Sequence, residues 1–238
     1  MVPRYLPAAV PALGGRNGTN LPRRMHVSTP SDAAPKASPI ADPAPLGLAA
    51  FALTTFLLSA INAGWAKSST GFDWWGYAIA YGGVAQLLAG MWEFRNNNVF
   101  GATAFSTYGG FWIGVGLWLH FVAPTARDPL QLNRDLGWIL LAFAIFNLYM
   151  LIISTQLNYA VFGVFLTLQI TEIFLFLGNF ATKVPALPPD PTSSGLIVAG
   201  GWIGVLTALV AWYASAAGVI NGIKGRQVLP VGKPLFNL

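Results

Sequence analysis

Apolar residues follow one another along this chain in six long runs that hold almost no charged side chains. The runs cover residues 46–65, 74–92, 99–121, 136–155, 159–180 and 195–223. A bilayer core about 30 Å thick needs about 20 apolar residues per helix, so each run is long enough to cross it. Because a backbone in lipid must satisfy its own hydrogen bonds, each run is predicted to be helical. The pattern therefore predicts an all-α membrane protein with six transmembrane helices.

The segments outside these runs have a different composition. Residues 1–40 are rich in Pro, Ala, Ser, Gly and Arg without apolar periodicity, which predicts a disordered N-terminal tail. The six-helix membrane domain is predicted over residues 41–232, with a short C-terminal tail at 233–238. Met25 is an alternative start to Met1, because the residues between them add no recognisable element.

Basic residues are unequally divided between the two sides of the predicted bundle. Nine Lys and Arg residues lie on the side that carries both termini: Arg4, Arg16, Arg23, Arg24, Lys36, Arg95, Lys224, Arg226 and Lys233. Four lie on the other side: Lys67, Arg127, Arg134 and Lys183. Lys and Arg are enriched in cytoplasmic loops. We therefore expect a multi-pass protein of the plasma (cell inner) membrane with both termini in the cytoplasm.

Composition narrows the chemistry. Of 238 residues 55% are hydrophobic and 9% charged, whereas a soluble domain has about 25% charged residues. The chain has no cysteine and two histidines, which predicts no metal site and no thiol chemistry. The sequence contains no cofactor motif and no nucleophile–base pair that would indicate an enzyme. It also contains no basic patch in a soluble domain that would indicate nucleic-acid binding.

Polar residues inside the runs are the candidates for function, because each needs a partner or a wet cavity. Thr55 and Asn62 share one helix face with Phe51, and Gln86 lies in the second run. These faces could converge on a narrow, mildly polar path. Alternatively, Ser and Thr bond their own helix backbone while Asn and Gln join neighbouring helices.

Glu172 is the ionisable side chain deepest inside a run, on one face with Leu168. A charge there is unfavourable by several kcal/mol, so we expect Glu172 to be protonated, paired or facing water. It is either a proton-coupling site or a structural hydrogen-bond donor. Glu93 and Arg95, at the end of the second run, are expected to form a local pair among the lipid headgroups.

Four glycines form two small-xxx-small pairs, Gly110 with Gly114 and Gly200 with Gly204. Small residues let helices approach closely in a membrane. These pairs predict helix packing, within one chain or between copies.

Several blocks of the chain resemble a known family. Asp42, Pro43, Ala44, Pro45, Leu46 and Gly47 match the NPAPLGL signature of the acetate uptake transporter family (AceTr), with Asp where the signature has Asn. The blocks at 86–109 and 228–232 are similar too. The resemblance covers about residue 40 to 232.

The resemblance implies a six-helix protomer with its own pore, assembled as a homo-hexamer, that moves acetate and in some members succinate. By motif position Phe51, Tyr108 and Leu168 correspond to the family's hydrophobic constriction. Glu172 stands where the family usually has an apolar residue. We expect a transporter or channel-like permease for small carboxylate anions, with or without proton symport. The alternatives are transport of ammonia or another small solute, and a non-transporting membrane sensor or scaffold.

Overall fold

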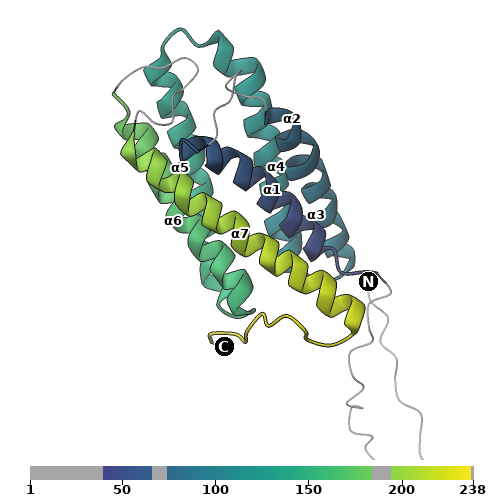
Figure 1. Cartoon of the computed structure of the whole chain (residues 1–238). Coiled ribbons are helices and arrows are strands. Elements are labelled where there is room, and N and C mark those ends of the chain that lie inside the picture. The colour runs from purple at the N-terminus through teal and green to yellow at the C-terminus, as the bar shows by residue number, and fades with distance from the viewer. Residues whose placement is uncertain (1–39, 66–73, 184–193, 237–238) are drawn as a thin grey trace, which may run out of the picture. The chain divides into compact units, whose positions relative to one another are not determined.

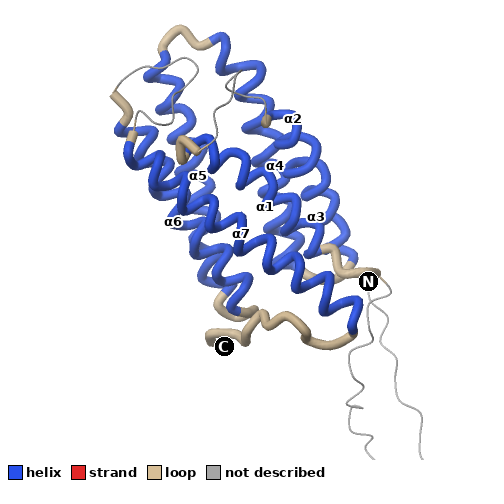
Figure 2. Tube along the Cα trace, in the orientation of Figure 1, coloured by secondary structure: helices blue, strands red, loops and turns tan. Residues whose placement is uncertain are grey.

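The computed structural model describes residues 40–65, 74–183 and 194–236, and all regular structure in these ranges is helical (Figure 2). The predicted tail falls outside them except for Ile40. The all-α class is therefore confirmed for the described part of the chain.

The described helices form six continuous runs (Figure 1). Four of them are single helices: α1 (Ala44–Asn62), α5 (Pro129–Ser154), α6 (Tyr159–Ala181) and α7 (Gly195–Lys224). The fifth run joins α2 (Trp75–Tyr77), the π-helix η1 (Ala78–Ala85) and α3 (Gln86–Arg95). The sixth joins α4 (Val99–Leu117), the π-helix η2 (Trp118–Val122) and the short 3₁₀ turn η3 (Ala123–Thr125). By length and composition α1, α5, α6 and α7 are candidate membrane spans.

The helix boundaries follow the apolar runs closely, apart from the start of α5. It begins at Pro129, seven residues before the predicted start at 136. The Asp128 carboxylate accepts hydrogen bonds from the backbone N–H groups of Leu130 and Gln131, and proline suits the first helical position. The cap therefore extends α5 by a charged segment that is too polar to belong to the apolar run.

Helix α1 lies at the centre of the packing (Figure 1). It contacts α7 on one side, and η1, α3 and α4 on the other. Helix α7 also packs on α6, which pairs with α5, while α3 pairs with α4. The functional side chains of α1 can therefore meet those of both halves of the chain.

Glycines allow the closest helix contacts. A Cβ at Gly201 of α7 would lie 2.6 Å from the backbone carbonyl carbon of Asn62, and one at Gly109 of α4 would lie 2.7 Å from the Leu87 backbone nitrogen. Gly200 and Gly204 are packed in the same way against α6 and α1. The glycine pair predicted in α7 is thus confirmed as a packing face inside the chain.

The second predicted pair behaves differently. Gly110 and Gly114 of α4 have no atom of the described chain near the place of a Cβ. Their role in packing between copies stays a prediction.

Glu93 does not lie where the sequence suggested. Its side chain is 0% exposed and lies beneath the start of α4, where a Cβ on Gly101 would be 2.7 Å from its Oε1 atom. Arg95 is exposed, and no ion pair joins it to Glu93 in this described segment. The predicted headgroup pair is wrong, because the turn at Asn96 and Asn97 brings the start of α4 over the Glu93 side chain.

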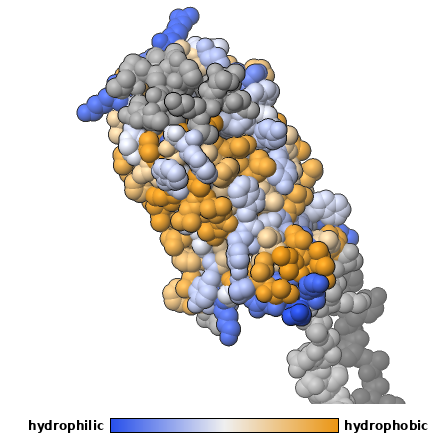
Figure 3. Space-filling view, viewed as in Figure 1, coloured by the Kyte–Doolittle hydropathy of each residue, from blue (hydrophilic) through white to orange (hydrophobic). Residues whose placement is uncertain are grey.

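Apolar side chains cover much of the face seen in Figure 3, and the strongly hydrophilic residues gather at its ends. Many large apolar side chains of the helices are exposed, among them Ile145 and Ile152 of α5 at 61% and 63%. A soluble monomer rarely exposes so much apolar surface. Contact with lipid accounts for this surface.

The segment that follows α7 packs on the turn between α5 and α6. The Asn221 side chain accepts hydrogen bonds from the Val228 and Leu229 N–H groups. Further along, the Ala160 N–H donates to the Val231 carbonyl and the Leu235 N–H to the Thr155 carbonyl. These bonds fix the C-terminal segment up to the last described residues.

Gly201→Ala should destabilise the protein by about 1–3 kcal/mol, because the added methyl group meets the backbone of α1, which cannot rotate away. Thermal unfolding in detergent, followed by tryptophan fluorescence, measures the shift. Gly222→Ala in the same helix is the matched control, since its methyl group enters open space. Equal unfolding temperatures for the two variants would contradict this packing.

Candidate substrate pathway

Three bulky side chains from three helices meet in the core. Phe51 of α1, Tyr108 of α4 and Leu168 of α6 are 4%, 4% and 7% exposed and belong to one apolar cluster. The rings of Phe51 and Tyr108 pack edge to face with centroids 5.6 Å apart. The structure thus brings together the three residues that the family resemblance pointed to.

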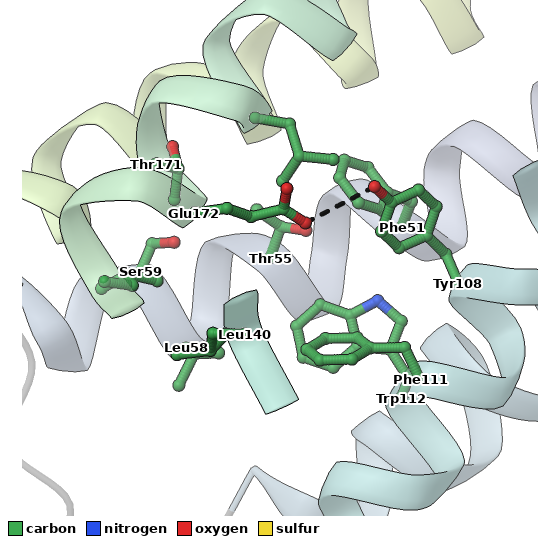
Figure 4. A pocket seen from close by; sticks show the side chains of 12 residues that line it. Phe51, Thr55, Leu58, Ser59, Tyr108, Phe111, Trp112, Leu140, Thr171 and Glu172 are labelled. Atoms are coloured by element: carbon green, nitrogen blue, oxygen red, sulfur yellow. Dashed lines mark hydrogen bonds between the residues drawn. The ribbon is translucent and has the colours of Figure 1, made fainter. Parts of the chain in front are cut away.

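A cavity lies on each side of these three side chains. The first, here called the Glu172 cavity, has a volume of about 40 Å³ (Figure 4). The second, the Gln86 cavity, has a volume of about 20 Å³. Phe51, Tyr108 and Leu168 are the residues that line both cavities. They therefore form a partition between two small spaces in series.

The remaining lining shows how the cavities differ. The Glu172 cavity is also lined by Thr55, Leu58, Ser59, Phe111, Trp112, Leu140, Thr171, Glu172 and Leu175. The Gln86 cavity is also lined by Leu48, Gln86, Ala104, Phe105, Val164 and Phe165. On this measure one water needs about 10–15 Å³, so the Glu172 cavity has room for about three waters and the Gln86 cavity for about one.

Several buried polar atoms of this lining have no hydrogen-bond partner in the protein. They are Thr55 Oγ1, Trp112 Nε1 and Glu172 Oε2, which belong to residues that line the Glu172 cavity, and Gln86 Oε1, which belongs to a residue that lines the Gln86 cavity. An unsatisfied buried polar group is unfavourable by about 1–3 kcal/mol. Hydroxyl and indole donors suit a carboxylate oxygen, and the surrounding Phe and Leu side chains suit a methyl group. The Glu172 cavity is therefore fitted to a small amphipathic guest.

Tyr108 is held in place by a buried polar network. Its hydroxyl donates to Asn147 Oδ1 of α5 at 2.9 Å. The Asn147 Nδ2 group donates to the Phe165 carbonyl and to Gln169 Oε1, both at 3.0 Å. Glu172 Oε1 lies 3.5 Å from the Tyr108 hydroxyl oxygen, as the dashed line in Figure 4 shows. The network ties α4, α5 and α6 together at the partition.

The polar residues predicted to line the path do not all reach it. Thr55 and Glu172 line one cavity and Gln86 the other. Asn62 is half-buried at the last residue of α1 and does not line either cavity.

Two residues of the site had no specific role predicted for them. Asn147 is one of several polar residues inside the apolar runs that could join a polar path, and Trp112 stood out only as part of a Gly-Gly-Phe-Trp segment. In the structure Asn147 orients Tyr108, and Trp112 presents its indole N–H among the residues of the Glu172 cavity.

The signature residues act as an anchor for the start of α1. Asp42 Oδ1 accepts from the Ala44 N–H at 3.0 Å, and the Ser215 hydroxyl of α7 donates to the Pro45 carbonyl at 2.6 Å. A Cβ at Gly47 would lie 2.7 Å from the Phe105 ring of α4. The signature therefore fixes α1 between α7 and α4, one turn before Phe51.

A helical protein with an apolar outer surface and two cavities in series, separated by a partition, has the architecture of a membrane transport protein. The chain matches the GPR1/FUN34/yaaH family over residues 26–232 and belongs to that family. The relationship to the acetate uptake transporters expected from the sequence is therefore confirmed.

Named relatives come from fungi and bacteria. The chain is 39% identical to "Acetate permease A" of Emericella nidulans, over 82% of this chain and 67% of that protein. It is 36% identical to "Ammonia transport outward protein 2" of Saccharomyces cerevisiae, over 75% of this chain and 61% of that protein. It is 34% identical to the "Succinate-acetate/proton symporter SatP" of Escherichia coli K12, over 82% of this chain and 96% of that one. The chain spans 58–67% of the length of the fungal relatives that it matches.

A solved structure shares the fold. The bacterial acetate channel SatP superimposes with a TM-score of 0.70 at 32% identity, over 81% of this chain and 99% of that chain. The relatives that these names describe are transporters and a channel, and the chain is accordingly a multi-pass membrane protein of a transporter family.

Tyr108→Phe should lower the stability by about 1–2 kcal/mol, because it leaves Asn147 Oδ1 buried without a donor. The readout is thermal unfolding in detergent. Tyr149→Phe is the control, since Tyr149 is 47% exposed and its hydroxyl lies outside this network. A Tyr108→Phe protein as stable as this control would contradict the network.

Proposed function

We propose that the chain carries acetate and other small carboxylates across the plasma membrane through the two cavities and the partition between them. The observation that supports this most is that Phe51, Tyr108 and Leu168, from three different helices, line both cavities. The relatives named acetate permease and succinate-acetate/proton symporter support the choice of small carboxylates as substrates.

The chemistry of the lining suits acetate. Thr55 and Trp112 provide an O–H and an N–H without partners inside the protein, which replace part of the hydration shell of a carboxylate. The ring of Phe51 and the side chain of Leu168 contact the methyl group as it passes.

The proposal includes six spans, both termini in the cytoplasm and assembly as a homo-hexamer. The runs from α2 to α3 and from α4 to η2 supply the two spans beyond the four candidates. The distribution of Lys and Arg supports the orientation. The open glycines Gly110 and Gly114 on α4 supply a surface for contact between copies.

Purified protein in liposomes should raise the uptake of labelled acetate well above that of protein-free vesicles. A sensor or scaffold predicts no such difference. Uptake at the protein-free level, from a preparation that remains folded by tryptophan fluorescence, would overturn the proposal.

Leu168→Ala should increase succinate uptake relative to acetate several-fold, because it shortens one of the three side chains of the partition. A dicarboxylate needs more room and loses more hydration than acetate does. Uptake of both labelled substrates by the same vesicles gives the ratio. Leu166→Ala, on the exposed face of α6, is the control, and an unchanged ratio in Leu168→Ala would count against the partition.

Ammonia is the second candidate substrate, because one relative is named for ammonia transport. Labelled methylammonium tests it in the same vesicles. The carboxylate proposal predicts that excess methylammonium leaves acetate uptake unchanged, whereas excess propionate lowers it.

A further inference from the structure

Glu172 carries an acidic group in the Glu172 cavity, beside the partition that separates the two cavities. Its side chain is 5% exposed on α6, one helical turn after Leu168 of the partition. Oε1 faces the Tyr108 hydroxyl, and Oε2 lies in the cavity lining without a partner. Figure 4 shows the carboxyl group pointing toward Tyr108 with the Thr55 side chain beside it. The group thus reaches both the partition and the space where a substrate fits.

The hydrogen-bond network determines which group holds which proton. The Phe165 carbonyl can only accept, so the Asn147 Nδ2 group must face it and the Asn147 Oδ1 atom must face Tyr108. Tyr108 has one hydroxyl hydrogen, and Asn147 Oδ1 at 2.9 Å takes it in preference to Glu172 Oε1 at 3.5 Å. The Tyr108 oxygen is then an acceptor toward Glu172. Two oxygens in this position attract each other only if Glu172 carries a proton.

The surroundings contain no counter-charge for an ionised Glu172. Among the described residues that line its cavity, none is Lys, Arg, His or Asp. Tyr108 of α4 is the other titratable group there, and Tyr149 of α5 is a further one near Tyr108. The facing groups of α1, Thr55 and Ser59, are neutral hydroxyls. A carboxylate anion that enters beside an ionised Glu172 would meet a like charge in a dry space.

We propose that Glu172 is the proton-transfer group of this chain, so that a small carboxylate crosses the partition as the neutral acid, with one proton for each molecule. This inference depends on the proposed function, and it assigns the coupling to one buried acidic residue of the Glu172 cavity.

The proton steps balance. The protonated Glu172 carboxyl turns its hydrogen from Tyr108 to Oε2, where an entering carboxylate shares it. The hydrogen passes to the substrate, which leaves as RCOOH, and Glu172 becomes a carboxylate. The Tyr108 hydroxyl can then donate to Glu172 Oε1 until a proton from the water on the side where the carboxylate entered restores the acid. Each cycle moves one carboxylate and one proton in the same direction, and no net charge.

Electrical measurement separates this mechanism from simple anion flow. A planar bilayer with an acetate gradient and equal pH on both sides reports acetate current, and diffusion of acetic acid through lipid adds none. Wild type should show labelled uptake in vesicles but no acetate-dependent current. Glu172→Gln keeps the size and a donor but cannot give up a proton, so acetate would cross as the anion and we expect an acetate-dependent current that wild type lacks.

Two further variants make the result specific. Glu172→Leu removes the ionisable group and should also lose the dependence of uptake on a pH gradient. Thr167→Val on the same helix should behave as wild type, because the Thr167 hydroxyl bonds only the backbone of α6 and does not line either cavity.

The outcomes are distinct. An acetate current in wild type as large as in Glu172→Gln would overturn the assignment of Glu172, and so would an electroneutral Glu172→Gln protein with normal uptake. The wild-type current decides this even if a variant does not fold. Uptake at the protein-free level for all four folded proteins would instead overturn the proposed function, and the inference with it.

Discussion

The hydrogen bond from the Tyr108 hydroxyl to Asn147 holds together the part of the structure on which everything else depends. It joins α4 to α5, and the Nδ2 group of the same Asn147 side chain continues the connection to α6. Because the bond is buried, breaking it leaves a polar group without water, so the ring of Tyr108 has one favoured position. In that position the ring packs against Phe51 and closes the space between the two cavities.

The rest of the fold brings α1 close enough for this contact. Gly201 and Gly204 of α7 let α1 approach from one side, and Gly82 of η1 leaves room for Thr54 on the other. The signature residues before Phe51 fix the start of the helix. Inside a membrane the hydrophobic effect does not drive helices together, because lipid tails are as apolar as the helices. Close packing at small residues drives their association instead. The site is therefore precise even though its helices are almost uniformly apolar.

The helices were predictable because lipid imposes one rule, an unbroken apolar run, on each of them. The start of α5 was not, since the Asp128 cap extends the helix through charged residues. The positions of Phe51, Tyr108 and Thr55 in the site followed from helical spacing and family motifs. Asn62 did not reach either cavity, and the bond by which Asn147 orients Tyr108 was not predicted, because spacing shows which residues share a face and not which face meets a neighbour.

For Glu93 and Glu172, too, the sequence does not show which neighbours each side chain meets. The sequence marks both as acidic residues in apolar surroundings, but only three-dimensional contacts separate their roles. Glu93 lies beneath the start of α4, and Glu172 lies at the partition with one oxygen free.

The absence of cysteine from the chain allows a direct measurement of the pathway. A single cysteine in place of Thr55, treated with a small anionic thiosulfonate reagent, places a charged group in the Glu172 cavity. We predict that the treatment stops labelled acetate uptake and that a reducing agent restores it, while the same treatment leaves a protein with cysteine at Thr167 active. Full acetate uptake by a protein shown by mass spectrometry to be modified at Thr55→Cys would contradict the central claim, that the substrate passes through this cavity.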